Sequence, residues 1–205
     1  MKTLTFLALG LASATAVQGM TVARVDAASF DAGPNFGPYV DNSSVSTSTV
    51  GTDTFIDLNA TVDGLFVNQL PAALSLDVDD LTFSINLRIP AGIDTSTVAD
   101  TLDIRVFGNA GAGSAQFRVD TSGLVAGGAF TTLTATGANF SFGDGTNGPA
   151  ASSGGTLNFS QVGVANFSGS GAIYDIESIT IDAVPEPSSA LLVGLAGLFM
   201  ARRRR

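Results

Sequence analysis

Residues 81–89 read LTFSINLRI, and this stretch decides the fold class. Its odd-numbered positions are all large and apolar, whereas its even-numbered positions hold a threonine, a serine, an asparagine and an arginine. Successive side chains of a β-strand point to opposite faces, so this period of two places all five apolar side chains on one sheet face. Pro90 and Gly92 follow and end the strand. The stretch therefore predicts a strand with one face on a hydrophobic core.

The same alternation continues on both sides of this strand. Leu102, Ile104 and Val106 alternate with Asp103 and Arg105, which predicts a strand over residues 102–107 with the two charged side chains pointing outward. Further stretches predicted as strands are 55–58, 74–78, 115–119, 129–135, 139–142, 156–159, 163–167 and 173–181. Residues 42–49 are rich in serine and threonine and are interpreted as either a loop or a polar edge strand.

Glycine-rich turns separate these stretches, and no long helical period occurs outside the two chain ends. Short strands at roughly 8–12-residue spacing are typical of a sandwich or barrel. We therefore expect one all-β domain over residues 20–183, an antiparallel and jelly-roll-like β-sandwich.

The composition of residues 20–183 restricts the chemistry of this domain. It has no cysteine, histidine, tryptophan or lysine, and four arginines stand against seventeen acidic residues, a formal net charge of −13. Nucleic acid is therefore not an expected partner, since phosphate binding needs clustered cations. Disulfides, thiolate or imidazole metal sites and Ser-His-Asp catalysis are excluded by the missing residue types.

Carboxylates are the remaining catalytic candidates. Asp77, Asp79 and Asp80 cluster in one stretch, and a glycoside hydrolase needs two carboxyl groups. Asp77 and Asp79, however, alternate with apolar residues as exposed strand positions do, and Glu177 lies between two isoleucines in the same manner. We interpret Asp77, Asp79 and Glu177 as solvated side chains and predict no catalytic residue.

Calcium and sugar are the remaining ligands considered. Residues 142–148 offer Asp144, Asn147 and free carbonyl groups, but D-G and N-G pairs form tight turns without an ion, so structural calcium is a minor alternative to no cofactor. Stacking on sugar favours tryptophan and tyrosine, and the chain has only Tyr39 and Tyr174. Phe36 and Tyr39 lie in a Gly/Pro-rich segment where we expect exposure, whereas Phe83 is expected in the core.

The amino-terminal residues 1–19 have the organisation of a secretory signal peptide. Lys2 provides the positive charge, Leu4–Ala12 is apolar, and the small residues Ala14 and Ala16 follow. We expect signal peptidase to cut after Ala16, with Gly19 as the alternative.

The carboxyl-terminal residues 184–205 read VPEPSSALLVGLAGLFMARRRR and combine three elements. Two prolines flank a glutamate, an uncharged twelve-residue run spans residues 190–201, and four arginines end the chain. Proline stops a preceding strand, and terminal arginines favour the cytoplasmic side of a membrane. As a helix the run reaches only about 18 Å, whereas a full span takes about 20 residues. Whether it crosses the bilayer completely is left open.

This order of elements resembles the PEP-CTERM sorting signal of Gram-negative bacteria. The resemblance implies that an exosortase recognises and processes the motif Val184, Pro185, Glu186, Pro187 and Ser188. It also implies a transient inner-membrane anchor and stop formed by Ala190, Leu191, Leu192, Val193, Leu195, Leu198, Phe199, Arg202, Arg203, Arg204 and Arg205.

We therefore expect an exported protein that is released to the cell surface or the extracellular matrix. Its expected role is structural and non-enzymatic, and the resemblance implies an association with exopolysaccharide. A carbohydrate-binding module is the alternative, and a carboxylate-based glycoside hydrolase is the third possibility.

Overall fold

A computed structural model describes residues 19–30, 43–60, 64–108, 113–143, 155–166 and 170–183, all within the compact unit Gly19–Glu186. Its strands are β1 (Met20–Asp26), β2 (Ser43–Val50), β3 (Asp53–Ala60), β4 (Gly64–Asp77), β5 (Leu81–Arg88), β6 (Thr101–Phe107), β7 (Ser114–Asp120), β8 (Thr131–Thr136), β9 (Phe140–Gly143), β10 (Thr156–Asn166) and β11 (Ala172–Ala183). Short 3-10 turns are η1 (Val78–Asp80), η2 (Thr95–Thr97) and η4 (Gly137–Asn139).

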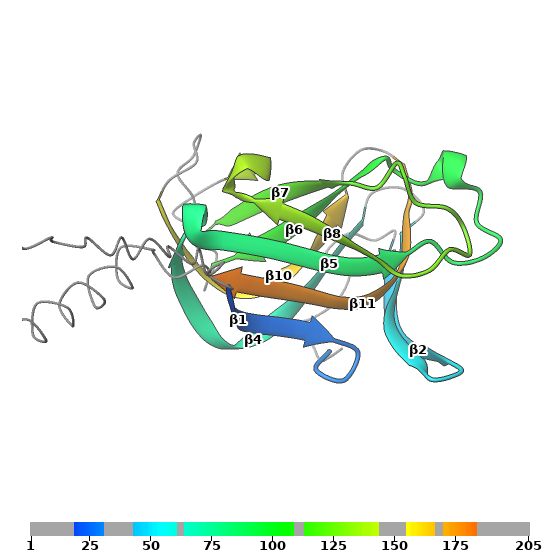
Figure 1. Cartoon of the computed structure of the whole chain (residues 1–205), viewed down its shortest axis with the longest axis horizontal. Helices are drawn as coiled ribbons and strands as arrows, with labels where there is room; N and C mark the ends of the chain where they lie inside the picture. The colour runs from blue at the N-terminus through cyan, green and yellow to red at the C-terminus, as the bar shows by residue number, and fades with distance from the viewer. Residues whose placement is uncertain are drawn as a thin grey trace, which may run out of the picture. The chain divides into compact units, whose positions relative to one another are not determined.

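The described strands form two antiparallel sheets that pack as a sandwich (Figure 1). The six-stranded sheet has the order β2-β3-β11-β5-β8, with β1 also paired to β11, and the five-stranded sheet has the order β4-β10-β6-β7-β9. Strands β3-β11-β5-β8 and β4-β10-β6-β7 interleave along the chain as in two Greek keys, which is the jelly-roll arrangement. The predicted fold class of an antiparallel β-sandwich is confirmed.

The core lies between the sheets and consists of the side chains that the period-two pattern turns inward. Phe83 of β5 and Phe117 of β7 are fully buried, and their rings stack at 4.5 Å between centroids, which joins the two sheets. Leu102, Ile104 and Val106 are buried as expected. Because β5 alternates buried and half-buried residues along its whole length, its outer face carries the polar side chains.

Strand β11 occupies the middle of the six-stranded sheet. It pairs with β5 along one edge, and with β3 and then β1 along the other. Its last residue, Ala183, pairs with both Leu81 and Met20. The first and last strands of the domain therefore lie side by side, with Met20 and Ala183 at the same end of the sheet.

Several strand boundaries differ from the predicted ones. β1 and the first part of β4 were not predicted, and the predicted strands 156–159 and 163–167 belong to one strand, β10. Pro71 suggests that a strand ends there, but β4 continues past it. The proline is tolerated because it lies where the pairing with β10 is interrupted between Phe159 and Gln161. Of the two interpretations of residues 42–49, the edge strand is correct, since β2 ends the six-stranded sheet.

Candidate functional site

The residues predicted for sorting and membrane anchoring, 184–205, lie outside the described residues. The same holds for residues 1–18 of the predicted signal peptide, for Phe36 and Tyr39, and for the proposed calcium ligands Asp144 and Asn147. The structure does describe Ala183, the residue that directly precedes the predicted sorting tail. Ala183 is held by pairing on both sides, so the chain leaves a central strand of the domain immediately before Val184.

A charged row crosses the outer face of the six-stranded sheet. Asp175 of β11 lies opposite Arg88 of β5 on one side and opposite Asp57 of β3 on the other. Arg88 Nε donates to Asp175 Oδ2 at 2.8 Å, and the Asp175 side chain is almost fully buried. Burial raises the pKa of Asp57, and the neighbouring Asp175 carboxylate raises it further. Arg88 therefore compensates the charge of Asp175, whereas the charged form of the neighbouring Asp57 is disfavoured.

Two phenylalanines enclose the Arg88 guanidinium. Its Cζ lies 4.4 Å from the ring centroid of Phe130 and 5.2 Å from that of Phe55, within the range of cation–π attraction. A hollow of about 250 Å³ adjoins this cluster and is lined by Arg88, Asp120, Leu124, Val125, Thr131 and Leu133, among others. Asp120 accepts hydrogen bonds from the side chain and backbone of Ser122, which lower its pKa. The hollow thus combines polar groups with apolar walls.

A second network covers part of the outer face of the five-stranded sheet. Asp103 is 5% exposed and accepts two 3.0 Å bonds from Nε and Nη2 of Arg118. Ser141 Oγ donates a third bond, at 3.1 Å, to the same carboxylate. The hydrogen bond to Asp103 raises the pKa of Arg118. Asp103 points away from the core as predicted, but it is covered by its partners rather than solvated.

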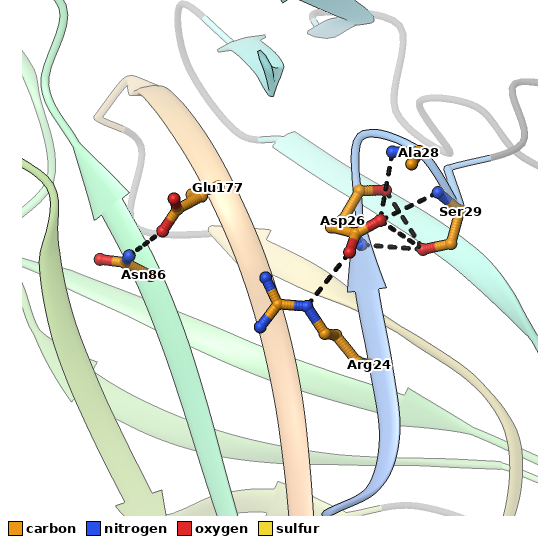
Figure 2. A network of polar contacts seen from close by, with 6 residues as sticks. All are labelled: Arg24, Asp26, Ala28, Ser29, Asn86 and Glu177. Atoms are coloured by element: carbon orange, nitrogen blue, oxygen red, sulfur yellow. Dashed lines mark hydrogen bonds and ion pairs between the residues drawn. The ribbon is translucent and has the colours of Figure 1, made fainter. Parts of the chain in front are cut away.

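Figure 2 shows a third set of polar contacts, around the end of β1 and the middle of β11. Asp26 Oδ1 accepts from the backbone of Ala28 and from the backbone and side chain of Ser29, and Arg24 donates to Oδ2 at 3.1 Å. Partial burial raises the pKa of Asp26, but these bonds outweigh burial and lower it overall. Glu177 is exposed as predicted and accepts a hydrogen bond from Asn86.

The clustered carboxylates at 77–80 build a turn. Asp77 ends β4 and accepts the backbone N–H of Asp79 at 3.0 Å, which caps η1. The expectation that Asp79 occupies a strand is wrong, although it is exposed as expected. Tyr174, counted among the stacking candidates, is fully buried and donates to the carbonyl of Ala99.

The described residues contain no group of three or more acidic, histidine or cysteine side chains that could hold a metal ion. Within the same ranges, no helix has the length and apolar character to cross a membrane.

Fold and strand register define the class of this protein as an antiparallel β-sandwich of two sheets. The chain carries a PEP-CTERM protein-sorting motif, because the profile of that motif matches residues 183–205. No curated protein matches the chain.

Among solved structures, a xylan-binding module CBM15 is 17% identical, with a TM-score of 0.48, over 80% of this chain and 98% of the module. The family 11 carbohydrate-binding module of the cellulosomal cellulase Lic26A-Cel5E of Clostridium thermocellum is 16% identical, with a TM-score of 0.47, over 84% and 99%. At these identities and scores the similarities carry no argument about function.

Proposed function

We propose that this chain is an exported, exosortase-processed protein that delivers its β-sandwich to the cell surface or the extracellular matrix, where the domain has a structural, non-enzymatic role. The observation that carries the proposal is the PEP-CTERM protein-sorting motif at residues 183–205. Such a motif implies export and membrane-anchored sorting before release to the surface.

The organisation of the domain supports a removable tail. Among the described residues, the buried members of the hydrophobic core cluster lie between Val25 and Ile181. The motif begins where β11 ends, and Gly19–Glu186 forms a compact unit of its own. Cleavage near Glu186 would therefore leave the domain complete.

Under this proposal the two terminal segments meet three partners in turn: signal peptidase, the inner membrane and exosortase. Signal peptidase removes the first 16 or 19 residues, and Ala190–Ala201 holds the chain in the inner membrane with Arg202–Arg205 on the cytoplasmic side. Exosortase then recognises Pro185, Glu186 and Pro187. The released domain is then associated with exopolysaccharide outside the cell.

The test compares the wild-type chain with a variant in which Pro185, Glu186 and Pro187 are all alanine, produced in the natural host. Cell fractions are assayed by immunoblotting, and the carboxyl terminus is sequenced by mass spectrometry. We expect the wild-type protein outside the inner membrane without its arginines, and the variant retained in the membrane with them. A control with Thr132, Thr134 and Thr136 changed to alanine should be sorted normally. An intact arginine terminus as the sole surface form of the wild-type protein would refute the proposal.

Carbohydrate binding is the second candidate function. The hollow beside Arg88 favours it, because ligand sites combine apolar walls with a few polar groups, here Arg88, Asp120 and Thr131. Glycan-array binding of the mature domain, followed by calorimetry of Thr131→Ala and Asp120→Ala, tests this idea. Thr136→Ala, at the other end of β8, is the control. Absence of glycan binding would leave the structural role alone.

Hydrolysis has less support from the described carboxylates. Asp175 is held by Arg88 and Asp103 by Arg118, so each of these buried carboxylates already has a cationic partner. Neither is therefore placed as the free nucleophile or base that a glycoside hydrolase needs.

A further inference from the structure

The second edge of β2 is a feature of the domain that the proposed function leaves without a role. β2 ends the six-stranded sheet, and no other described strand pairs with its second edge. The turn end of the β2–β3 hairpin projects away from the other strands in Figure 1. A strand in this position presents a row of backbone donors and acceptors to any chain that can approach it.

The pairing of β2 with β3 shows which backbone groups face that edge. Eight residue pairs run without a bulge from Ser43–Ala60 to Val50–Asp53, where Gly51 and Thr52 form a two-residue turn. The pair that closes such a turn is hydrogen-bonded, and hydrogen-bonded pairs alternate with non-bonded ones. Val45, Thr47 and Thr49 belong to the non-bonded pairs. Their N–H and C=O groups therefore point away from β3, toward the second edge of β2.

The other edge strands carry features that discourage pairing, and β2 carries none of them. β1 has a register shift and the charged residues Arg24 and Asp26. β4 contains Pro71 at an interruption of its ladder, and β9 has only four residues. β8 has only six residues, two fewer than β2. β2 reads SSVSTSTV, with no charge, no proline, no glycine and no bulge.

We propose that β2 pairs antiparallel with β2 of a second copy of this chain, joining two six-stranded sheets across a twofold axis. A second copy suits this edge because an uncharged strand places no like charges opposite each other. The rest of the domain has a formal net charge of −13, so two copies repel least along a neutral strip that projects from the body. Serines at 44, 46 and 48 alternate with Val45, Thr47 and Thr49, so antiparallel pairing of two copies places only small neutral side chains opposite each other.

The first test uses the mature unit Gly19–Glu186 and a proline variant. Thr47→Pro removes an N–H that faces the second edge of β2 and leaves the hydrogen bonds to β3 in place. We expect a dimer by analytical ultracentrifugation, and a dissociation constant raised about tenfold or more in the variant, because the symmetric pair loses two hydrogen bonds. Circular dichroism should show an unchanged sheet signal. A wild-type monomer at millimolar concentration overturns the proposal, and so does a dimer that Thr47→Pro leaves unaltered.

The second test exploits the absence of cysteine from the chain. Single cysteines replace Ser46, Thr47 or Ser48 on β2, and Thr134 on β8 as the matched control. Under mild oxidation we expect a covalent dimer from at least one β2 variant, because residues near the twofold axis approach to disulfide distance. Cross-linking of Thr134→Cys alone would place the interface on β8 and overturn the proposal.

Salt provides a third readout. Screening of two acidic domains strengthens a neutral contact and weakens one formed by ion pairs. We therefore expect the dissociation constant to fall as sodium chloride rises from low to physiological concentration. A rise would contradict pairing through β2.

Discussion

Two arginine–aspartate pairs of this domain differ in the burial of the carboxylate. In the Arg118–Asp103 pair the aspartate side chain is only 7% exposed, whereas in the Arg24–Asp26 pair it is 32% exposed. A carboxylate that loses its partner in a buried position keeps its desolvation penalty, and an exposed one is hydrated again. The two pairs therefore have different energetic weight despite similar distances.

Removal of each arginine tests this difference. We expect Arg118→Ala to lower the free energy of unfolding by about 2 kcal/mol, because Asp103 keeps only its bonds from neutral groups. Arg24→Ala, the matched control, should lower it by less than about 1 kcal/mol. Urea denaturation at pH 7 measures both values. Equal losses would show that burial of Asp103 does not decide the outcome.

Asp57 gives a prediction about pH. Its pKa lies above the ordinary 3.8, first through burial and then through Asp175. A raised pKa means that the folded state binds this proton more tightly than the unfolded state does. The stability that the bound proton contributes is complete below pH 3.8 and is lost as the pH rises through the folded pKa. At pH 7 the charged carboxylate therefore destabilises the fold.

Asp57→Asn should remove this effect. We expect the melting temperature at pH 7 to rise by about 1–2 °C, since the group is half-exposed and partly screened. At pH 3 the two proteins should melt alike. Asp53→Asn, exposed on the same strand, serves as the control in calorimetry, and an increase of equal size at both pH values would contradict the explanation.

The sequence does not predict the network around Asp103, because the network depends on the register of two paired strands. Alternation in residues 102–107 correctly places Asp103 outside the core, but its partner Arg118 comes from β7, fifteen residues away. The pairing depends on the register of β6 with β7, which places these two residues directly opposite each other. Periodicity assigns a face to each residue of a strand, whereas only the register tells which neighbour covers it.

At the scale of elements, strands flanked by clear turn signals were the predictable ones. β5 follows its alternation and ends before Pro90, close to the predicted boundary. Only the last four of the fourteen residues of β4 were predicted, because Pro71 interrupts the pattern and an edge strand tolerates it at an irregularity. β1 follows the predicted signal peptide directly, and its short pattern did not stand out from that segment.

The β2–β3 hairpin depends on the backbone of Gly51. Its φ is +66°, a conformation that L side chains rarely adopt, and no atom lies within 4 Å of the position of an added Cβ. Gly51→Ala should therefore destabilise the domain by about 1 kcal/mol through the backbone alone. Gly123→Ala has the same open surroundings without a positive φ and should be neutral or slightly stabilising. Urea titrations of both variants check this, and similar values for the two would rule out a backbone cause.

At the scale of the whole molecule, the boundary between domain and tail can be located by truncation. Ala183 is the last residue of β11, and residues 179–183 pair with both β1 and β5. Ile179 and Ile181 in this segment are fully buried. A strand in the middle of a sheet supplies hydrogen bonds on two sides and core side chains at the same time, so the domain should tolerate no cut within it.

Two truncations of the mature chain make this quantitative. A stop after Ala183 should leave the melting temperature within about 2 °C of the longer chain, because Ile181 is the last fully buried residue that the structure describes. A stop after Ser178 removes two buried isoleucines, worth about 2–5 kcal/mol each, from a domain whose total stability is about 5–15 kcal/mol. We expect this shorter chain to lose its cooperative thermal transition in circular dichroism. If it melts cooperatively, the end of β11 is not part of the folding unit, and the processed domain need not extend to the sorting motif.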